Sequence, residues 1–360
     1  MRICFFLLLA FGLAACSSPI VPDGPAPGIA PPASSWRQHD MDRPQPPRVE
    51  PGDPPSDAVQ LITPNLDAWE HADGSPARWE HDGDALVIAP GTGSIQTQQS
   101  FGDLQLHLEW QPAPSNRTGQ DRSNSGLVLM DGRYEIQILD SWESTTYADG
   151  RAAAIYGQFP PLADATRPPS EWQTYDLFFR RPRLDDSGTV IEPARLTLLH
   201  NGVLVQNNEA LVGTTIWLQS LPYDDPHPES GPIQLQDHGS PVRFRSLWVR
   251  PIPARPEPPP GTNELATVTL TDRQLDRLVG VYRRPNDAYT IARRGDGLEL
   301  SFPWRPEVVL PMLPLSPTRF HLAHTAGTVE FVLDDTGAPI ELVFSMGGTT
   351  WRATHDELAP

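Results

Sequence analysis

Lysine is absent from this chain of 360 residues, which contains 27 arginines. The absence excludes Schiff-base chemistry and a catalytic lysine. Acidic residues number 45, and the formal net charge at pH 7 is −18. This charge argues against a nucleic-acid partner and against electrostatic adhesion to anionic lipid.

Cysteine is almost absent as well, since the 2 cysteines, Cys4 and Cys16, both lie near the N-terminus. Residues 1–15 combine an early Arg2 with an apolar run too short for an ordinary membrane-spanning helix, which is typical of a signal peptide. The end of this run, Leu13-Ala14-Ala15-Cys16, resembles a bacterial lipoprotein cleavage box. The resemblance implies lipidation of Cys16 and anchoring of the mature chain in a membrane.

Removal of residues 1–15 would leave a mature chain with no free thiol and no disulfide, because Cys16 would carry the lipid. Cysteine nucleophiles, thiolate zinc sites and disulfide scaffolds are then excluded. In lipoproteins of two-membrane bacteria, a residue such as Ser17 after the cysteine usually goes with the outer membrane. We therefore expect a lipid-anchored protein of the bacterial cell envelope. A plain secretory signal with a chance cysteine is the alternative.

Proline marks the division of the chain. Residues 19–57 contain twelve prolines, and we expect residues 16–57 to form a stiff, extended tether. A second Pro-rich stretch predicts a linker at 253–261. The two stretches delimit a domain at 58–252 and a smaller one at 262–360, both of ordinary size.

The first domain is predicted to be all-β, because short alternating runs are separated by turn residues and no long helical period is present. In the run 104–110, for example, every second residue is Leu or Trp. Many short antiparallel strands favour a β-sandwich or jelly roll. The expected strands cover 104–110, 126–130, 134–140, 172–179, 195–199, 203–205, 233–236 and 242–249.

The second domain is predicted to be a small β-meander or barrel. Thr271 is a candidate N-cap for a short helix over 272–279, and Gly280 would end it. The expected strands after it cover 289–292, 298–302, 319–322, 329–333 and 340–344.

Two strands of the first domain carry a row of polar side chains. In 134–140 the period of two puts Glu135 and Gln137 on one face, opposite the aliphatic residues. In 233–239 the same period aligns Gln234, Gln236 and His238. We expect the two strands to lie side by side and to present a wet surface that could bind a polar ligand such as a sugar. The alternative for each residue alone is an ordinary solvated face.

The first domain resembles the 3-keto-disaccharide hydrolase domain family over about residues 59–252, through the order and spacing of its motifs. The chain has Gln173 and Ser246 where that family often has Asn, and its opening motif is reduced at 63–69. The resemblance implies a concanavalin-like jelly roll. The matching segments are Asn124-Ser125-Gly126, Tyr134-Glu135-Ile136-Gln137-Ile138-Leu139-Asp140, Ile155-Tyr156, Glu171-Trp172-Gln173-Thr174-Tyr175, Asn201-Gly202, Gly231-Pro232-Ile233-Gln234-Leu235-Gln236-Asp237-His238-Gly239 and Val242-Arg243-Phe244-Arg245.

The resemblance implies cleavage of 3-keto-glycosides by elimination followed by hydration. A ketone at C3 acidifies the hydrogen at C2, so the reaction needs a base near C2 and a group that stabilises the enolate. Glu135 is the expected base or metal ligand, and His238 the expected acid/base or enolate stabiliser. The residues expected to bind hydroxyls or to support the site are Gln137, Gln234, Gln236, Asn124, Glu109 and His107. Tyr156, Trp142 and Trp172 could stack on a sugar ring, although aromatic residues of sandwiches usually belong to the core.

Other possibilities remain open at this stage. The sequence requires no cofactor, but a divalent cation such as Ca²⁺ could bind oxygen ligands from Asp121, Asp140, Asp149 or Glu143. A conventional retaining glycosidase is a second enzyme class, because residues 135–140 are reminiscent of the laminarinase motif Glu-x-Asp-x-x-Glu. The Gln at its middle position and the shorter Asp140 tell against it, since that chemistry needs two close carboxylates. A non-catalytic carbohydrate-binding module is a third possibility.

Overall fold

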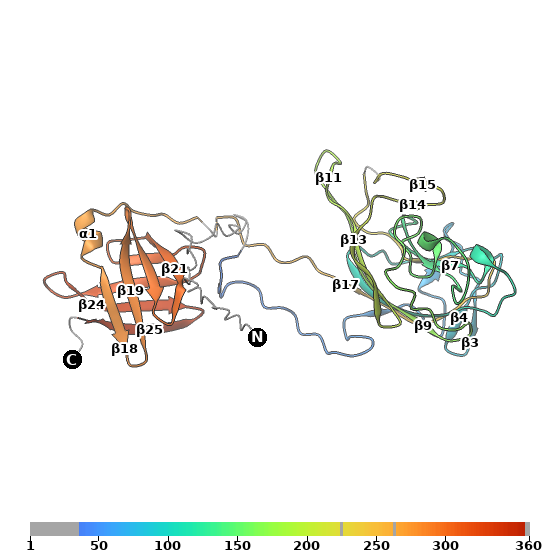
Figure 1. Ribbon diagram of the computed structural model, residues 1–360, viewed down its shortest axis with the longest axis horizontal. Helices are drawn as coiled ribbons and strands as arrows, with labels where there is room; N and C mark the ends of the chain where they lie inside the picture. Colours follow the sequence, from blue (N-terminus) through green and yellow to red (C-terminus); the bar gives the residue numbers. More distant parts are fainter. Residues whose placement is uncertain (1–35, 224–225, 262–263, 357–360) are drawn as a thin grey trace, which may run out of the picture. The chain divides into compact units, whose positions relative to one another are not determined.

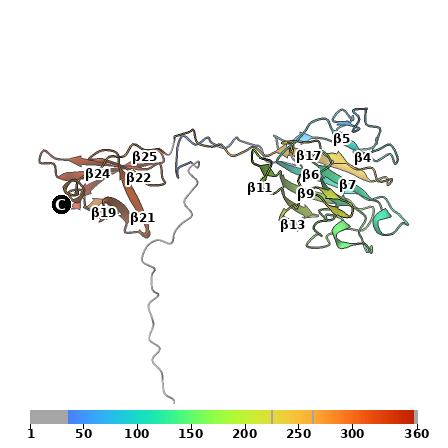
Figure 2. The same cartoon turned by 90° about the horizontal axis from the view of Figure 1, so that it is seen from above.

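The computed structural model describes residues 36–223, 226–261 and 264–356, and in it the chain forms two compact units (Figures 1 and 2). One unit comprises the described residues of Pro47–Ala254, and the other comprises the described residues up to Pro46 together with those from Arg255 onward. The expected signal peptide and Cys16 lie outside the described residues. Within the described part of the chain, no helix has the length and apolar character needed to cross a membrane.

The first unit contains a large antiparallel sheet of eight strands. The side chains of Leu104, Leu106, Leu108 and Trp110 are buried in the core, as the strict alternation of this segment predicts. The order across the sheet is β13 (Val203–Ala210), β12 (Arg195–His200), β9 (Gln173–Arg180), β6 (Leu104–Gln111), β17 (Arg243–Pro251), β4 (Ala85–Val87) and β3 (Glu80–Asp82), with β1 (Val59–Gln60) paired to β17.

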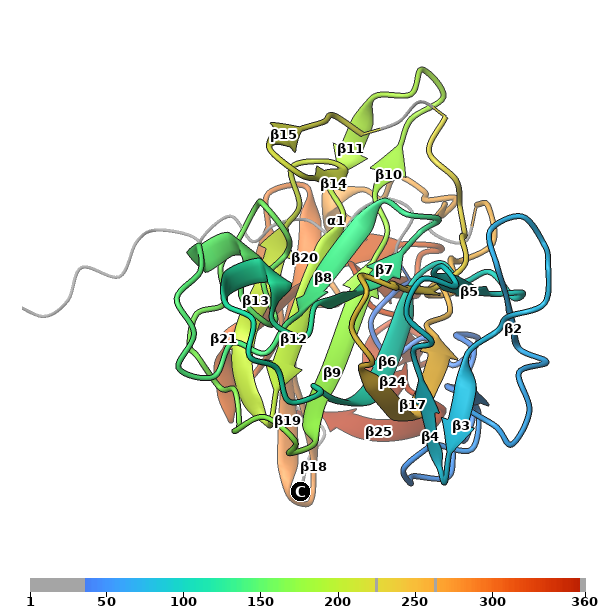
Figure 3. The same ribbon diagram turned by 90° about the vertical axis from the view of Figure 1, so that its right-hand side faces the viewer.

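A second sheet of five strands supplies the other layer of this unit (Figure 3). Leu127 and Ile136 are opposite each other in the register, and both are buried in the core cluster that also contains the leucines of the large sheet. The two sheets therefore form a sandwich around one hydrophobic core. The order is β2 (Trp69–Glu70), β5 (Ile95–Thr97), β16 (Gln234–Leu235), β7 (Ser125–Leu129) and β8 (Tyr134–Ile138).

Short elements complete the first unit. Two small hairpins and two 3-10 turns lie outside the main sheets: β10 (Arg183–Leu184) with β11 (Val190–Glu192), β14 (Thr215–Ile216) with β15 (Gln219–Ser220), η1 (Gly119–Asp121) and η2 (Ala148–Gly150). The predicted fold class, a concanavalin-like jelly-roll sandwich followed by a second small β-rich domain, is confirmed.

The second domain is a closed antiparallel barrel in which each strand pairs with the next. The expected capping box is present at Thr271, but the helix α1 (Asp272–Asp276) is shorter than predicted, and Gly280 already begins a strand. The strands are β18 (Gly280–Arg284), β19 (Asp287–Arg294), β20 (Gly297–Phe302), β21 (Arg305–Pro314), β22 (Arg319–Leu322), β23 (Thr328–Leu333), β24 (Pro339–Met346) and β25 (Thr349–His355).

The described part of the expected tether packs against folded structure. The backbone N–H of Gln38 donates to the His324 carbonyl oxygen (3.2 Å), and its carbonyl oxygen accepts from Ala326 (2.8 Å). Within the sandwich unit, Asp53 accepts a hydrogen bond from the indole of Trp248 (2.7 Å), and Asp57 pairs with Arg250. Proline enrichment predicts an extended chain but does not reveal that an extended chain can hydrogen-bond to a neighbouring loop or sheet.

Candidate functional site

Strands β7, β8 and β16 present a polar surface on the side of the small sheet that faces away from the core. In the register, Val128 of β7 lies between Glu135 of β8 and Gln234 of β16. The backbone N–H of Gln236 donates to the Gly126 carbonyl oxygen (3.0 Å), so Gln236 follows Gly126 in the next row. The two predicted strands therefore belong to one sheet, but the expectation that they lie side by side is wrong, because β7 pairs with both and lies between them.

A cavity of about 460 Å³ opens over this surface, and we call it the polar hollow. Its size is within the range of small-molecule sites. Six of the residues singled out from the sequence line it: Asn124, Glu135, Gln137, Tyr156, Gln236 and His238. The remaining lining residues are Gln120, Tyr147, Thr215, Ile216 and Trp217.

Glu135 is the carboxylate among the residues that line the polar hollow, and no arginine is found among them. Burial raises the pKa of Glu135 from 4.5 to about 7, because an ionised carboxylate is poorly solvated there. Its side chain has room because residue 126 is glycine: a Cβ at Gly126 would lie 2.8 Å from Oε1 of Glu135. A carboxyl group with this pKa can accept and return a proton near neutral pH.

Neutral amides surround the carboxyl group of Glu135. In one orientation of its side-chain amide, Gln137 donates a hydrogen bond to Gln120 Oε1 (3.0 Å). In the flipped orientation, the same amide donates to Glu135 Oε1 (3.1 Å). Asn124 donates to the Gln120 carbonyl oxygen (2.7 Å). Oε1 of Gln236 is buried without a hydrogen-bond partner in the structure. These groups can hydrogen-bond to hydroxyls of a polar ligand without offsetting the charge of a carboxylate.

Tyr156 reaches the polar hollow from a segment that pairs with the edge of β8. Its backbone N–H donates to the Glu135 carbonyl oxygen (3.1 Å), and its hydroxyl lies 3.0 Å from the hydroxyl of Tyr147. Burial is the largest cause of a raised pKa for Tyr156, followed by its hydrogen bond to Tyr147. The phenol therefore remains protonated and can donate a hydrogen bond at neutral pH.

His238 is exposed and lines the polar hollow from the turn that follows β16. The carboxylate of Asp237 holds this turn in place by accepting hydrogen bonds from Gly91 (2.8 Å), Gly93 (3.0 Å) and Gly239 (2.9 Å). The structure thus brings the imidazole and the carboxyl group of Glu135 to the same cavity from β16 and β8.

The prediction that Glu109 belongs to the same surface is wrong. Since Leu108 and Trp110 face the core, Glu109 lies on the outer face of the large sheet, on the other side of the sandwich from Glu135. It forms an ion pair with Arg245 (2.7 Å), whose guanidinium stacks over Trp172 (4.1 Å). The alternation of polar and apolar residues identifies the polar face of a strand, but it does not predict which of the two sheets contains that strand.

Other candidates also lie outside the polar hollow. His107 is on the same outer face as Glu109, where it pairs with Asp176 (2.7 Å) and stacks on Trp248. Gln234 lies in the expected row of β16 but is not among the residues that line the cavity. Trp142 does not line the cavity either.

The acidic candidates for a metal site do not gather. Asp140 is buried and bound to the guanidinium of Arg122 (2.7 Å), and burial raises its pKa against the opposing effect of this arginine. Asp149 lines a neighbouring cavity, whereas Asp121 and Glu143 are exposed. In the portions of the chain that the structure describes, no three His, Cys, Asp or Glu side chains are grouped so that they could hold a metal ion.

Residues that sequence inspection did not identify complete the site. Gln120, Tyr147 and Thr215 come from loops and a short hairpin, where no periodic pattern marks the direction of a side chain. Thr215 accepts a hydrogen bond from the backbone N–H of Glu135 (2.9 Å) and so joins the hairpin to β8. The available signal for Trp217 was a run of three adjacent large apolar residues, Ile216-Trp217-Leu218, between polar ones.

Comparison with solved structures shows two related proteins from Parabacteroides distasonis ATCC 8503, each described as a candidate glycosyl hydrolase. The first is 38% identical, covers 59% of this chain and 94% of its own, and superimposes with a TM-score of 0.55. The second is 20% identical, covers 54% of this chain and 99% of its own, and has a TM-score of 0.40. Comparison with curated proteins finds no match.

The sandwich is also the part of the chain that matches a described domain family. Residues 58–250 match the 3-keto-alpha-glucoside-1,2-lyase-like domain, and this range coincides with the sandwich that contains the polar hollow. The match covers more than half of the chain and includes Glu135, Gln137, Gln236 and His238. The chain belongs to the 3-keto-alpha-glucoside-1,2-lyase-like domain family.

Proposed function

We propose that the sandwich cleaves 3-keto-glycosides, 3-keto-disaccharides among them, by removing the proton next to the ketone. The observation that carries the proposal is the partly buried carboxyl group of Glu135, whose pKa is raised to about 7 in a cavity lined by neutral hydrogen-bonding groups. The name of the matching family and the description of the 38% identical relative as a candidate glycosyl hydrolase support it.

The first step is proton transfer from C2 of the sugar to Glu135. The electron pair of the C2–H bond moves into the enolate of the C3 ketone, and the carboxylate becomes a carboxylic acid. Hydrogen-bond donors in the polar hollow, such as the Gln137 amide, the Tyr156 hydroxyl or a protonated His238, would stabilise the enolate oxygen. Glu135 is suited to this role because burial makes its carboxylate a stronger base than an exposed one.

In the second step the enolate expels the leaving group from C1. The C1–O bond breaks, its electron pair goes to the leaving oxygen, and a C1=C2 double bond forms. The departing oxygen takes a proton, for which His238 is the proposed donor. Water then adds to C1 and gives a proton to His238, and C2 recovers a proton from the carboxylic acid of Glu135. The net reaction consumes one water and yields a 3-keto sugar and an alcohol.

A conventional retaining glycosidase fits the cavity less well. That chemistry requires two carboxyl groups roughly 5–5.5 Å apart, one as acid and one as nucleophile. Asp140, the second acid of the sequence motif, forms an ion pair with Arg122 and is not among the residues that line the polar hollow.

The test is to incubate the purified protein with 3-keto-trehalose and 3-keto-sucrose, and in parallel with the unoxidised disaccharides, in D₂O. We expect cleavage of the keto compounds alone, with deuterium incorporated at C2 of the product. Cleavage of the unoxidised sugars without deuterium at C2 would favour the retaining glycosidase. Binding without turnover would favour a carbohydrate-binding module. A parallel assay with a chelator tests the expectation of a divalent cation such as Ca²⁺.

We also propose that the protein acts at the bacterial outer membrane, held by a lipid on Cys16. The support is the sequence Leu13-Ala14-Ala15-Cys16-Ser17 alone. In a bacterial host, Cys16→Ser should abolish incorporation of labelled fatty acid and release the protein from the membrane fraction. Continued labelling of the Cys16→Ser protein would contradict the proposal.

A further inference from the structure

The hairpin β14–β15 stands beside the carboxyl group of Glu135 and is fixed there by hydrogen bonds. The backbone N–H of Thr215 donates to the Arg133 carbonyl oxygen (2.8 Å), and its hydroxyl accepts from the backbone N–H of Glu135 (2.9 Å). The hairpin is therefore attached to β8 at the residues that hold the proposed base. Its tip, Trp217-Leu218, follows two residues later.

The tip of the hairpin exposes three consecutive apolar side chains. Ile216 is 39% exposed, Trp217 66% and Leu218 80%. Leu218 also has a φ of 57°, a left-handed conformation that costs energy for a residue with a branched side chain. Glycine or asparagine would occupy this turn position at lower cost. An apolar cluster that is exposed and strained stabilises neither the fold nor its solubility, and it is a common feature of binding surfaces.

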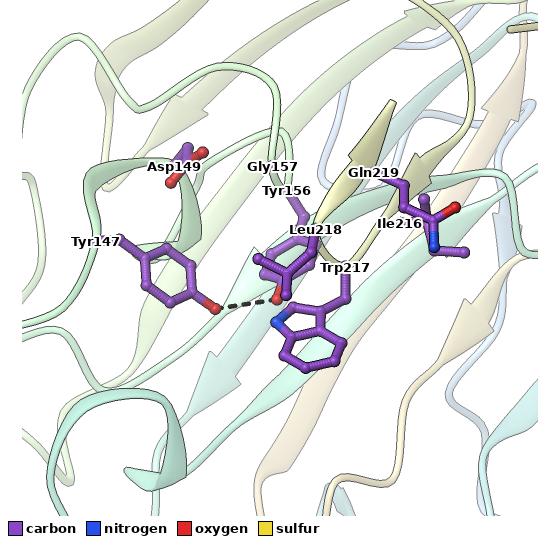
Figure 4. Close-up of a pocket in the computed structure, with 8 residues that line it drawn as sticks. All are labelled: Tyr147, Asp149, Tyr156, Gly157, Ile216, Trp217, Leu218 and Gln219. Carbon is purple, nitrogen blue, oxygen red and sulfur yellow. Dashed lines mark hydrogen bonds between the residues drawn. The ribbon is translucent and has the colours of Figure 1, made fainter. Parts of the chain in front are cut away.

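These side chains form one wall of a second cavity of about 470 Å³, which we call the apolar hollow (Figure 4). Tyr147 and Tyr156 are joined by their hydroxyl groups, and in this view Tyr156 and Leu218 lie between Tyr147 and Trp217. Tyr147, Tyr156, Ile216 and Trp217 line the polar hollow as well, so the two cavities share a wall and adjoin each other.

We propose that the apolar hollow binds the leaving group and selects for a flat, apolar one, such as the aryl group of a 3-keto-glycoside. This inference rests on the proposed function. If Glu135 removes the proton from C2, the bond that breaks is at the adjacent C1, and the leaving group must extend from the polar hollow into an adjoining space. The indole of Trp217 and the rings of Tyr147 and Tyr156 offer aromatic surfaces on which an aryl group can stack.

The shared wall explains how one site can treat the two halves of its substrate differently. Amides and a carboxyl group face the sugar ring, whereas Ile216, Trp217 and Leu218 face the leaving group. A hydrophilic leaving group, such as the second sugar of a 3-keto-disaccharide, would lose water against these side chains for few hydrogen bonds in return, so it should be accepted less well than an aryl group. Asp149, which also lines the apolar hollow, offers the one carboxylate there and could accept a hydrogen bond from a phenolic hydroxyl.

The experiment compares phenyl and methyl 3-keto-glucosides with the wild-type protein and with Trp217→Ala. Phenolate is intrinsically the better leaving group, so the informative quantity is the change in the phenyl-to-methyl ratio of kcat/KM upon substitution. We expect Trp217→Ala to lower this ratio roughly tenfold, as loss of a stacked aromatic contact implies. Trp217→Phe should retain most of it. Trp304→Ala removes a similarly exposed tryptophan from the barrel and should leave the ratio unchanged.

A binding measurement separates failure of this inference from failure of the proposed function. In a Glu135→Gln background, the phenyl compound should bind more tightly than the methyl compound by calorimetry, and Trp217→Ala should remove the difference. If no keto-glycoside is cleaved but this preference is found, the proposed function fails and the inference on the apolar hollow stands. Equal binding of the two compounds, or an unchanged ratio in Trp217→Ala, would overturn the inference.

Discussion

Gly126 makes room for the carboxyl group of Glu135, because a Cβ at position 126 would lie 2.8 Å from Oε1 and 3.2 Å from Cδ of that side chain. The three nearest atoms all belong to Glu135, and none belongs to the backbone. The glycine therefore affects the position of the proposed base directly and the fold only slightly.

Substitution of Gly126 by alanine should displace the Glu135 carboxyl group and lower kcat by at least tenfold on a 3-keto-disaccharide. Because the backbone at Gly126 is ordinary strand, the melting temperature should stay within a few degrees of the wild-type value. Gly297→Ala, in strand β20 of the barrel, is the matched control, since its Cβ would meet only ordinary van der Waals contact. Full activity in Gly126→Ala would show that the glycine is not needed to position the base.

The pH dependence of kcat/KM should follow the ionisation of Glu135. Proton abstraction needs the carboxylate, and the pKa of this group is raised to about 7, so activity should rise with pH through about 7. A His238→Gln variant should keep this rise at lower overall activity. If the rise near pH 7 disappears in His238→Gln, the assignment of this rise to Glu135 is wrong.

The same ionisation should affect folding stability in the opposite direction. Since the folded-state pKa of Glu135 lies above the unfolded value of 4.5, the folded protein binds more protons between pH 4.5 and about 7, and stability falls as the pH rises through this window. The change in the free energy of unfolding caused by Glu135→Gln should therefore be more favourable at pH 8 than at pH 4. The difference should reach up to about 3 kcal/mol, at about 1.4 kcal/mol per pKa unit. Urea denaturation at both pH values measures this difference.

Glu109→Gln should leave turnover of 3-keto-disaccharides unchanged, because Glu109 lies on the other outer face of the sandwich and pairs with Arg245. The partly exposed ion pair should contribute no more than about 1 kcal/mol to the free energy of unfolding. Glu135→Gln is the matched comparison and should abolish turnover. A strong loss of activity in well-folded Glu109→Gln would contradict the assignment of the site to the small sheet.

Asp140 should matter for folding rather than for chemistry, since its side chain is buried and bound to Arg122. Removal of one partner of a buried ion pair typically costs about 3–5 kcal/mol, and Asp140→Asn should lose stability in this range. Asp82→Asn breaks the more exposed pair with Arg243 and should cost about 1 kcal/mol or less. Loss of activity in Asp140→Asn without loss of stability would revive the retaining glycosidase mechanism.

The periodic segments of the chain were the predictable part of the fold. Strict alternation placed Leu104, Leu106 and Leu108 in the core, and the same rule put Glu135 and Gln137 opposite Ile136. Three barrel strands, β18, β21 and β25, were not among the predicted ones. β21 contains three prolines, which are depleted in strands, and β25 has little apolar periodicity.

The sequence by itself determined that the chain is β-rich, that it has no lysine chemistry, and which strands have a polar face, because each of these follows from composition or from the fixed period of a strand. Tertiary structure decided which polar face became a site. Glu109 and Glu135 have the same local pattern, but only Glu135 lies where the 152–157 segment and the β14–β15 hairpin hydrogen-bond to its strand. Burial, and with it the raised pKa of Glu135, depends on those distant loops, and no local pattern specifies how loops pack.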